Sequence, residues 1–457
     1  MKKQDAIKRV IVLTLIMLII IAQTLIFWHY WNTHYNPGII RMFVMRGQLL
    51  MVFLYLVLYV GISNIYGAFK IAMLRTPDLI FSQILSILFV NVIIYIQISL
   101  LMLRMAPVVP IIAMTCENIL CSTVWSILAK YVYKNVYPPR DILLVFCDRD
   151  PDNLVKKVNS RKDKYHISDS IHIKEGLHEI EKTAMRHEAV LLCDIPGDIR
   201  NDIMKFCFSE SIRVYVTPKL SDIMMKGSES NNLFDTPLFL MRNKGLKWEQ
   251  RVVKRIFDVI VSLIMLIVLS PILLLIAALI KMWDGKEVFY KQDRLTIDGK
   301  VFQILKFRSM NVDAEVDGAR LSMGDEDPRV TPIGKVIRKT HLDELPQLIN
   351  ILKGDMSLVG PRPERPEIAA EYEKSIPEFS FRLKVKAGLT GYAQVYGKYN
   401  TTPYDKLKLD LYYIEYYNFI LDVKIFLMTL KILFKKDNTE GVKKGQKTAL
   451  KEKPEKK

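Results

Sequence analysis

Apolar segments long enough to cross a lipid bilayer constrain the fold of this chain more than any other feature. Four of them lie near residues 10–28, 48–68, 79–103 and 106–128, and a fifth, VIVSLIMLIVLSPILLLIAALI, covers residues 259–280 without a charge. About 20 apolar residues span the hydrocarbon core of a membrane as a helix. Outside the fifth segment, the composition after residue 136 is that of an ordinary soluble protein. The sequence therefore predicts a four-helix transmembrane region at 1–135, followed by folded domains.

Basic residues set the orientation of the first four segments, because loops rich in Lys and Arg remain on the cytoplasmic side of a membrane. Positive charge is found before the first segment, between the second and third (Lys70, Arg75) and after the fourth (Lys130, Lys134). Three arginines in the opposite loops weaken this contrast without reversing it. With an even number of crossings, the chain returns to the cytoplasm by residue 135.

The formal net charge of +17 limits the class of partner. A surplus of this size is compatible with nucleic-acid binding. The basic residues, however, gather beside apolar segments and in the tail, where anionic lipid head groups are the expected partner. We therefore expect membrane lipids and no nucleic acid as partners. Residues 435–457 hold nine lysines, four acids and no aromatic residue, which predicts a disordered basic tail.

Strand-like and helical stretches alternate between residues 141 and 242. Runs such as DILLVF, EAVLLCD and IRVYVTP are separated by stretches such as GLHEIEKTAMRH, which predicts βαβ units and a parallel sheet. A dinucleotide-binding domain would carry G-x-G-x-x-G after its first strand, so that the backbone can approach a pyrophosphate. Here the first strand runs into CDRDPDN, which has three acids and no glycine. We expect residues 136–246 to form a Rossmann-like domain without a dinucleotide.

Two local structures are predicted in the last part of the chain. The run VFYKQDRLTIDGKVFQILKFRSM predicts a β-hairpin that turns at Asp298 and Gly299. Further on, Thr340 or Asp343 is expected to cap a helix that ends before Gly354. Asp343 and its neighbour Glu344 would then lie at the positive end of a helix dipole, where acids are ordinarily only stabilising.

Basic residues on both sides of these acids suggest a chemical role as well. Within RKTHLDELPQLINILKGDMSLVGPRPER, residues 338–365, arginines and a lysine stand immediately before the two acids and again after the helix. Guanidinium groups neutralise phosphate oxygens, and Mg²⁺ binds one or two carboxylates together with substrate phosphates. Carboxylates also serve as nucleophiles that form phosphoryl-enzyme intermediates. The residue types therefore favour a site that holds a phosphate diester beside a carboxylate nucleophile.

The motifs KFRSM, HLDELPQLINILKGDMSLVGPRPE and GLTGYAQVYGK follow a basic KRIFD and the apolar Ser-Pro segment in this order. Together they resemble the bacterial sugar transferase family, the monotopic polyprenyl-phosphate sugar-1-phosphate transferases. The resemblance covers roughly residues 250–434, and the N-terminal part resembles the large members of that family. It implies a membrane protein of the α plus α/β class. Four transmembrane helices and a Rossmann-like domain would precede a mainly helical catalytic domain at 247–434 that contains a re-entrant helix.

The resemblance also implies an activity and assigns roles to the motif residues. A sugar-1-phosphate would pass from a UDP-sugar to undecaprenyl phosphate with release of UMP, as the first membrane step of exopolysaccharide, capsule or O-antigen assembly. Asp343 would be the nucleophile that forms a covalent phosphosugar intermediate. Glu344 and Asp343 would bind Mg²⁺, and both Arg338 and Arg362 would hold phosphates.

Other motif residues are assigned less specifically. Lys306 and Arg308 of KFRSM would line the same site. Gln394 of TGYAQV is a candidate substrate-binding residue. The resemblance leaves open whether it binds the sugar, the nucleotide or neither. The chain departs from the family pattern twice: KAGLTG replaces the usual proline-glycine, and Lys398 stands where an arginine is typical.

The Ser270-Pro271 pair bears on whether residues 256–281 cross the membrane, because proline inside a helix removes a hydrogen bond and bends or breaks it. Basic residues flank both ends of the segment, with Arg251, Lys254 and Arg255 before it and Lys281 and Lys286 after it. UDP-sugars are cytoplasmic, so a straight span would carry the site away from its donor. In the resembled family this pair marks a re-entrant helix. We expect a helix, broken at the pair, that enters one leaflet of the bacterial inner membrane and returns, which leaves the catalytic domain in the cytoplasm.

Two other functions remain open. A nucleotide-dependent oxidoreductase or epimerase would use the Rossmann-like domain, although the missing glycine fingerprint argues against it. A non-catalytic membrane adapter would recruit polysaccharide-assembly proteins through the same domain. The sequence identifies neither the sugar nor the final polysaccharide, and it leaves open whether the chain forms a homo-oligomer.

Overall fold

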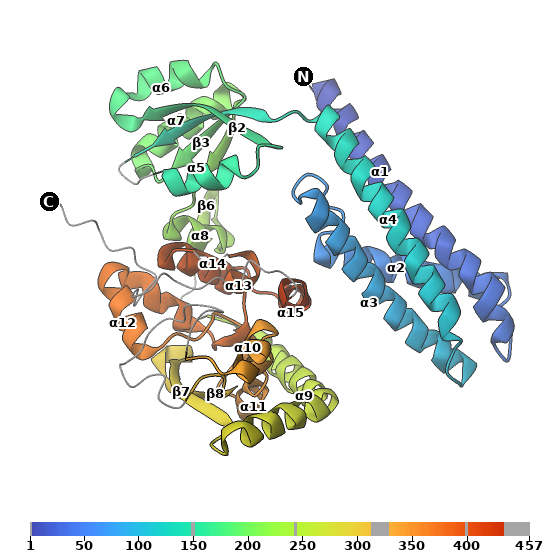
Figure 1. The fold of residues 1–457 in the computed structure, drawn as a ribbon. Helices are drawn as coiled ribbons and strands as arrows, with labels where there is room; N and C mark the ends of the chain where they lie inside the picture. Colours follow the sequence, from blue (N-terminus) through green and yellow to red (C-terminus); the bar gives the residue numbers. More distant parts are fainter. Residues whose placement is uncertain (1, 148–150, 242–244, 312–328, 398–400, 434–457) are drawn as a thin grey trace. The chain divides into compact units, whose positions relative to one another are not determined.

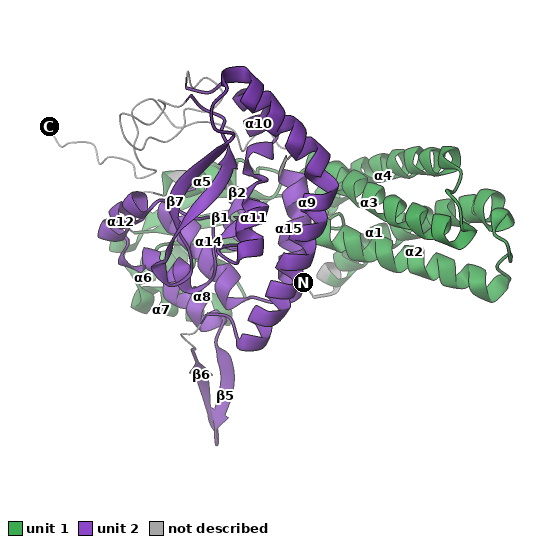
Figure 2. Ribbon diagram, turned by 90° about the horizontal axis from the view of Figure 1, so that it is seen from below, with its two compact units in different colours: residues 1–218 green, residues 219–457 purple. Residues whose placement is uncertain are grey.

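The computed structural model describes residues 2–147, 151–241, 245–311, 329–397 and 401–433. The chain divides into two compact units, Met1–Pro218 and Lys219–Lys457, which Figure 2 colours separately. The predicted basic tail and the family departure at Lys398 lie outside the described residues.

The first unit begins with four long helices, α1 (Lys2–Tyr30), α2 (Met45–Tyr66), α3 (Thr76–Met102) and α4 (Val108–Val136). α1 packs against α2 and α4, and α3 packs against the same two helices (Figure 1). Apolar side chains face outward while polar groups pair inside the bundle: Gln83 accepts a hydrogen bond from Tyr59 at 2.8 Å, and Gln23 donates to the Asn118 carbonyl at 3.0 Å. A helix bundle surrounded by lipid requires this arrangement. Length and composition make these four helices, and α9 (Trp248–Asp284) of the second unit, candidates for crossing a membrane.

A parallel sheet follows the helices in the first unit. Its strands, β1 (Arg140–Phe146), β2 (Tyr165–His172), β3 (Ala189–Cys193) and β4 (Arg213–Val216), lie in the order β2-β1-β3-β4. Leu143 and Val145 of β1 pack in one core with α6 (Leu177–Ala184) and α7 (Gly197–Ser209). Ile142 and Leu144 belong to the core on the other face, with α5 (Asp152–Asn159). The predicted parallel α/β architecture is confirmed.

Residues 219–241 and 245–246, which we expected to belong to the Rossmann-like domain, pack with the second unit instead. The parallel sheet ends at β4, and α8 (Leu220–Lys226) contacts α14 (Pro403–Glu415). Ile223 and Leu246 are buried in the main core of the second unit. Between them, β5 (Glu229–Leu233) and β6 (Thr236–Leu240) form an antiparallel hairpin.

α9 is a single helix with Pro271 inside it, and Figure 1 shows it bent, with its two halves running in different directions. Proline has no N–H, so Pro271 cannot donate to the carbonyl of Ile267, four residues earlier. The Ser270 hydroxyl donates to that carbonyl at 2.8 Å. The expected break is therefore a bend, and the Ser-Pro pair forms it without leaving this carbonyl unpaired in an apolar segment.

Both halves of α9 pack on the second unit. In the first half, Asp258 accepts hydrogen bonds from the Ser357 hydroxyl at 3.0 Å and the Leu358 amide at 2.9 Å. In the second half, Ile276 and Ile280 share a core with side chains of β8 (Val301–Phe307) and α10 (Pro332–Lys339). A straight helix of 37 residues would be about 55 Å long, and the bend shortens the distance between its ends. Many residues between the two contacts are apolar and exposed, among them Leu263, Ile267, Val268, Leu274 and Leu275.

The rest of the second unit starts with the predicted hairpin. β7 (Phe289–Leu295) and β8 (Val301–Phe307) are antiparallel, and Asp298 and Gly299 in the turn have φ angles of 57° and 73°, which confirms the position of the turn. The remaining elements are α10 (Pro332–Lys339), α11 (Gln347–Lys353), β9 (Ser357–Val359), α12 (Pro366–Ser375), β10 (Gly388–Thr390), α13 (Tyr392–Tyr396), α14 and α15 (Phe419–Leu433). Short 3₁₀ segments lie at Leu342–Glu344 and Pro377–Lys384.

Candidate active site

Asp343 and Glu344 lie in a 3₁₀ turn between α10 and α11, and not at the start of a helix. Thr340 closes the C-terminal end of α10, and His341 then adopts a left-handed backbone with φ 55°, which redirects the chain. α11 begins only after Pro346, without a side-chain cap. The predicted caps at Thr340 and Asp343 are therefore wrong, and Asp343 and Glu344 do not lie at the positive end of a helix dipole. The predicted stop at Gly354 is confirmed, with φ 97°.

Glu344 is held between two cations. Its Oε1 accepts hydrogen bonds from Lys306 Nζ at 2.7 Å and from Arg362 Nη2 at 2.8 Å. Burial opposes ionisation, but the charges of Arg362 and Lys306 and their hydrogen bonds outweigh it and hold the pKa of Glu344 well below its usual range. Glu344 is therefore an anion that aligns two basic side chains from β8 and from the loop after β9.

Asp343 has a different environment from its neighbour. Its side chain is buried, and within the described residues its carboxylate makes no hydrogen bond or ion pair. Burial and then the negative charge of Glu344 raise the pKa of Asp343, while the charges of Lys306, Arg338 and His341 act in the opposite direction. A poorly solvated carboxylate with unused lone pairs is a suitable nucleophile, provided that nearby cations keep it ionised.

The other predicted site residues, Arg338, Arg308 and Gln394, have separate environments. Arg338, in the last turn of α10, acts on the Asp343 carboxyl through its charge. Arg308 instead forms an ion pair with Asp284 at the C-terminal end of α9. Gln394 lies in α13, where its Nε2 donates to the Leu389 carbonyl at 3.5 Å. The contacts therefore join Lys306 and Arg362 to Glu344, and they join neither Arg308 nor Gln394 to it.

Two basic residues of the α9 lead-in, used above as flanking charges for the membrane segment, have partners inside the protein. Lys254 forms a buried ion pair with Asp422 at 2.6 Å. Arg255 donates to the Ile351 and Leu352 carbonyls at 2.5 and 2.7 Å. The last carbonyls of a helix lack partners within the helix, so Arg255 completes the C-terminal end of α11. These two charges are explained by packing, and they do not report the orientation of the helix.

The loop that carries Arg362 is fixed by a close backbone crossing with the segment 388–391. The Gly360 amide donates to the Thr390 carbonyl at 2.8 Å, and the Gly388 amide donates to the Pro361 carbonyl at 2.9 Å. A Cβ on Gly388 would lie 2.1 Å from the Gly360 nitrogen. Only glycine allows this approach, so the AGLTG segment supports the Arg362 loop from behind.

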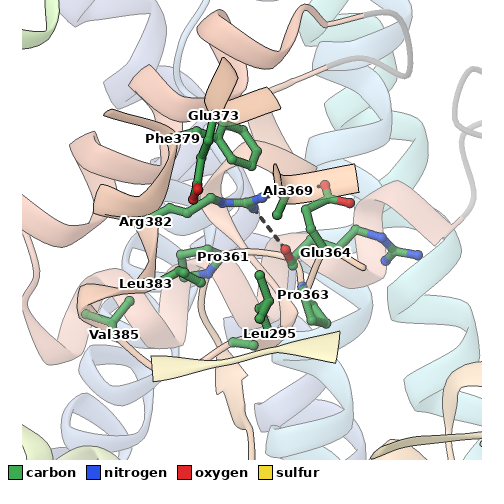
Figure 3. A pocket seen from close by; sticks show the side chains of 12 residues that line it. Leu295, Pro361, Pro363, Glu364, Ala369, Glu373, Phe379, Arg382, Leu383 and Val385 are labelled. Atoms are coloured by element: carbon green, nitrogen blue, oxygen red, sulfur yellow. Dashed lines mark hydrogen bonds and ion pairs between the residues drawn. The ribbon is translucent and has the colours of Figure 1, made fainter. Parts of the chain in front are cut away.

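Sequence reasoning missed a buried charged cluster behind the same loop. It consists of Arg294, Glu364, Arg382, Lys406 and Asp410. Figure 3 shows Arg382 directed toward Glu364, with an ion pair between them at 3.5 Å. Only Glu364, in PRPE, stands in a motif, and no local signal marks the others because their partners are distant in sequence.

Comparison with known proteins places these residues in a family. The pattern of the family described as "Bacterial sugar transferase" matches residues 249–436. An uncharacterized sugar transferase of Bacillus subtilis is 38% identical over 180 residues, which are 39% of this chain and 86% of that protein.

Longer relatives match over a smaller share of their length. A "UDP-N-acetylgalactosamine-undecaprenyl-phosphate N-acetylgalactosaminephosphotransferase" of Aeromonas hydrophila is 34% identical over 55% of this chain and 60% of its own. A "UDP-glucose:undecaprenyl-phosphate glucose-1-phosphate transferase" of Escherichia coli is 34% identical over 58% of this chain and 52% of its own. The chain thus covers little more than half the length of these two proteins. The match over most of the Bacillus subtilis protein, together with the family pattern on the unit that holds Asp343, gives the assignment: this chain belongs to the bacterial sugar transferase family.

Proposed function

We propose that this protein is a phosphoglycosyl transferase that moves a sugar-1-phosphate from a UDP-sugar to undecaprenyl phosphate. The products are undecaprenyl-diphosphate-sugar and UMP. Family membership and the names of the relatives support the reaction class. The observation that carries the proposal is the buried Asp343 carboxylate, without a hydrogen bond, beside a Glu344 that is fixed by Lys306 and Arg362.

The reaction proceeds in two displacements on one phosphorus atom. An Asp343 oxygen attacks the phosphorus that carries the sugar, a bond from this oxygen to phosphorus forms, and the bond to the UMP oxygen breaks, so that UMP leaves with the electron pair. A phosphate oxygen of undecaprenyl phosphate then attacks the same phosphorus and frees the Asp343 carboxylate. Lys306 and Arg362 neutralise the phosphate oxygens, which lowers the repulsion between two anions.

A divalent cation fits the donor set at this site. The described residues contain no cluster of three or more His, Cys, Asp or Glu side chains that could hold a metal by themselves. Mg²⁺, however, is usually bound by one or two carboxylates and by substrate phosphates. Among the described residues, Asp343 has no hydrogen-bond partner, and Glu344 uses Oε1 for both of its cations, so that Oε2 remains for a metal. When bound, Mg²⁺ would neutralise the charge of the donor diphosphate.

The membrane topology that we propose places this chemistry at the inner, cytoplasmic face of the cytoplasmic membrane. Both halves of α9 pack on the same unit, and the exposed apolar residues lie between them. We infer that α9 enters one leaflet and returns, while the four helices of the first unit cross the membrane. A polyprenol chain cannot leave the bilayer, so an active site close to α9 meets the acceptor phosphate at head-group height.

The test is release of UMP from the full chain in membranes supplied with undecaprenyl phosphate and a panel of UDP-sugars. Asp343→Asn keeps the shape of the side chain and removes the nucleophile, and we expect a loss of at least about a hundredfold. Asp293→Asn, at an exposed position of β7, is the matched control and should retain wild-type activity. Equal rates from wild type and Asp343→Asn would end the nucleophile assignment. A wild-type protein that is inactive with every donor would favour the non-catalytic adapter.

A further inference from the structure

The loop Pro361–Glu364 is anchored at every one of its four carbonyls. The Pro361 carbonyl accepts from the Gly388 amide at 2.9 Å, and the Glu364 carbonyl accepts from the Leu295 amide at 3.0 Å. The two carbonyls between them are held by side chains: Arg382 Nη2 donates to the Arg362 carbonyl at 2.9 Å, and Arg294 Nη1 donates to the Pro363 carbonyl at 3.1 Å. Two prolines further restrict the backbone of this loop, because each fixes its own φ angle.

Of these two arginines, Arg382 is buried and contacts two carboxylates. Its side chain is only 3% exposed, and Nη2 lies 2.8 Å from Asp410 Oδ2 while Nη1 lies 3.5 Å from Glu364 Oε1. The guanidinium carbon lies 5.0 Å from the centre of the Phe379 ring. Nη2 therefore serves both Asp410 and the Arg362 carbonyl, while Nη1 faces Glu364 and, among the described residues, has no hydrogen-bond partner. The two carboxylates and the Phe379 ring fix the plane of the guanidinium that donates to the Arg362 carbonyl.

Burial of this cluster is expensive unless every charge is paired, and hydrophobic residues of the same size would often stabilise a core equally well. General stability therefore does not explain why a charged group lies here. A need for fixed orientation explains it, because the planar guanidinium of an arginine contacts two carboxylates and one carbonyl in defined directions. From the Arg362 backbone the chain of contacts continues to Glu344, where the Arg362 guanidinium donates to Oε1 at 2.8 Å.

We propose that Arg382 is a positioning residue of the active site, which acts through Arg362. It holds the Arg362 backbone so that the Arg362 guanidinium meets Glu344 and the donor phosphate in one orientation. Asp410 and Glu364 hold the Arg382 guanidinium in place. This inference rests on the proposed function, since it assigns Arg382 to the same reaction.

A double-mutant cycle tests the inference, with the UMP-release assay of the full chain in membranes. Arg382→Lys keeps the charge but can reach only one of its partners well, and we expect kcat/KM for the UDP-sugar to fall about tenfold. Arg362→Met alone should cost more, about a hundredfold. If Arg382 acts through Arg362, adding Arg382→Lys to Arg362→Met should change kcat/KM by less than about twofold, because residues that act as a unit are not additive.

Lys406→Met is the matched control. Lys406 pairs with Glu364 in the same cluster but does not donate to the Arg362 carbonyl. We expect its kcat/KM to stay within about threefold of wild type, with a thermal unfolding midpoint lowered as much as that of Arg382→Lys. If Arg382→Lys does not accumulate in membranes, Asp410→Asn replaces it in the cycle with the same expected coupling.

The outcomes separate this inference from the proposed function. Wild-type protein that releases no UMP counts against the proposed function. An active wild type in which the Arg382→Lys and Arg362→Met losses multiply counts against the role of Arg382 alone. Equal losses in kcat/KM from Arg382→Lys and Lys406→Met would also overturn that role, because they would mean that the cluster contributes only stability.

Discussion

Replacing Lys306 by methionine removes one of the two cations that hold Glu344 and one of the charges that keep Asp343 ionised. Burial raises the pKa of Asp343, and so does the charge of Glu344, while Lys306 is the first of the cations that oppose them. Arg338 and His341 still act on Asp343 in the variant, so the loss of Lys306 raises its pKa further without removing every opposing charge.

The sign of this shift fixes the change in the pH profile. Asp343 attacks only as the carboxylate, so activity is lost as the pH falls through its pKa, and a higher pKa moves this loss to higher pH. We expect the acid limb of kcat/KM for UMP release to lie at higher pH in Lys306→Met than in wild type. Above that limb the rate should stay lower as well, because one phosphate-neutralising charge is missing.

Initial rates at low donor concentration between pH 5 and 9 measure this profile, and Lys291→Met, at an exposed position of β7, serves as the control. The control should keep the wild-type limb. An acid limb of Lys306→Met that coincides with that of wild type, or lies at lower pH, would refute the assignment of Asp343 as the ionised nucleophile beside Lys306.

Three further predictions concern α9. Ser270→Ala removes the donor to the Ile267 carbonyl and should destabilise the folded protein by about 1–3 kcal/mol, seen as a lower unfolding midpoint in lipid discs. Pro271→Leu restores a backbone N–H and should allow some molecules to straighten, so that a cysteine placed after α9 reacts with an impermeant reagent outside the cell; labelling confined to the cytoplasm would contradict this. Lys254→Met leaves the buried Asp422 without its ion-pair partner and with the hydrogen bond from the Tyr413 hydroxyl at 2.8 Å, at a cost of about 3–5 kcal/mol. Lys254→Met with Asp422→Leu should recover much of that loss, and an unchanged midpoint in the single variant would contradict the role of the pair.

Short sequence patterns predicted the turns, helix ends and strands whose conformation depends on residues close together in the sequence. The turn at Asp298 and Gly299 was predictable because these residue types tolerate positive φ, and the parallel sheet was predictable from alternating strands and helices. The stop at Gly354 follows the same rule. The cap at Asp343 failed because a left-handed His341 redirects the chain between α10 and α11, and nothing in the sequence marks histidine for that conformation.

The environment of the site depends on pairs of residues that are far apart in the sequence. Asp343 and Glu344 are neighbours with similar side chains, yet one is buried without a hydrogen bond and the other pairs with Lys306 and Arg362. Lys254 seemed to be a flanking charge of a membrane segment until its partner, Asp422, was known. Such pairings are set by tertiary packing, so residue type and spacing alone could not predict them.

The bend of α9 also bears on how the nucleophile segment is assembled. α10 packs on the second half of this helix, through Ile333 and Ile337, while α11 is joined to the first half through Arg255. The short turn with Asp343 connects α10 to α11. The angle between the two halves of α9 therefore sets the distance between α10 and α11. In the topology that we propose, bilayer thickness and lateral pressure act on that angle, and the surrounding lipid then influences the geometry around Asp343 as well as supplying the acceptor. Turnover should therefore vary with acyl-chain length even when the acceptor is saturating.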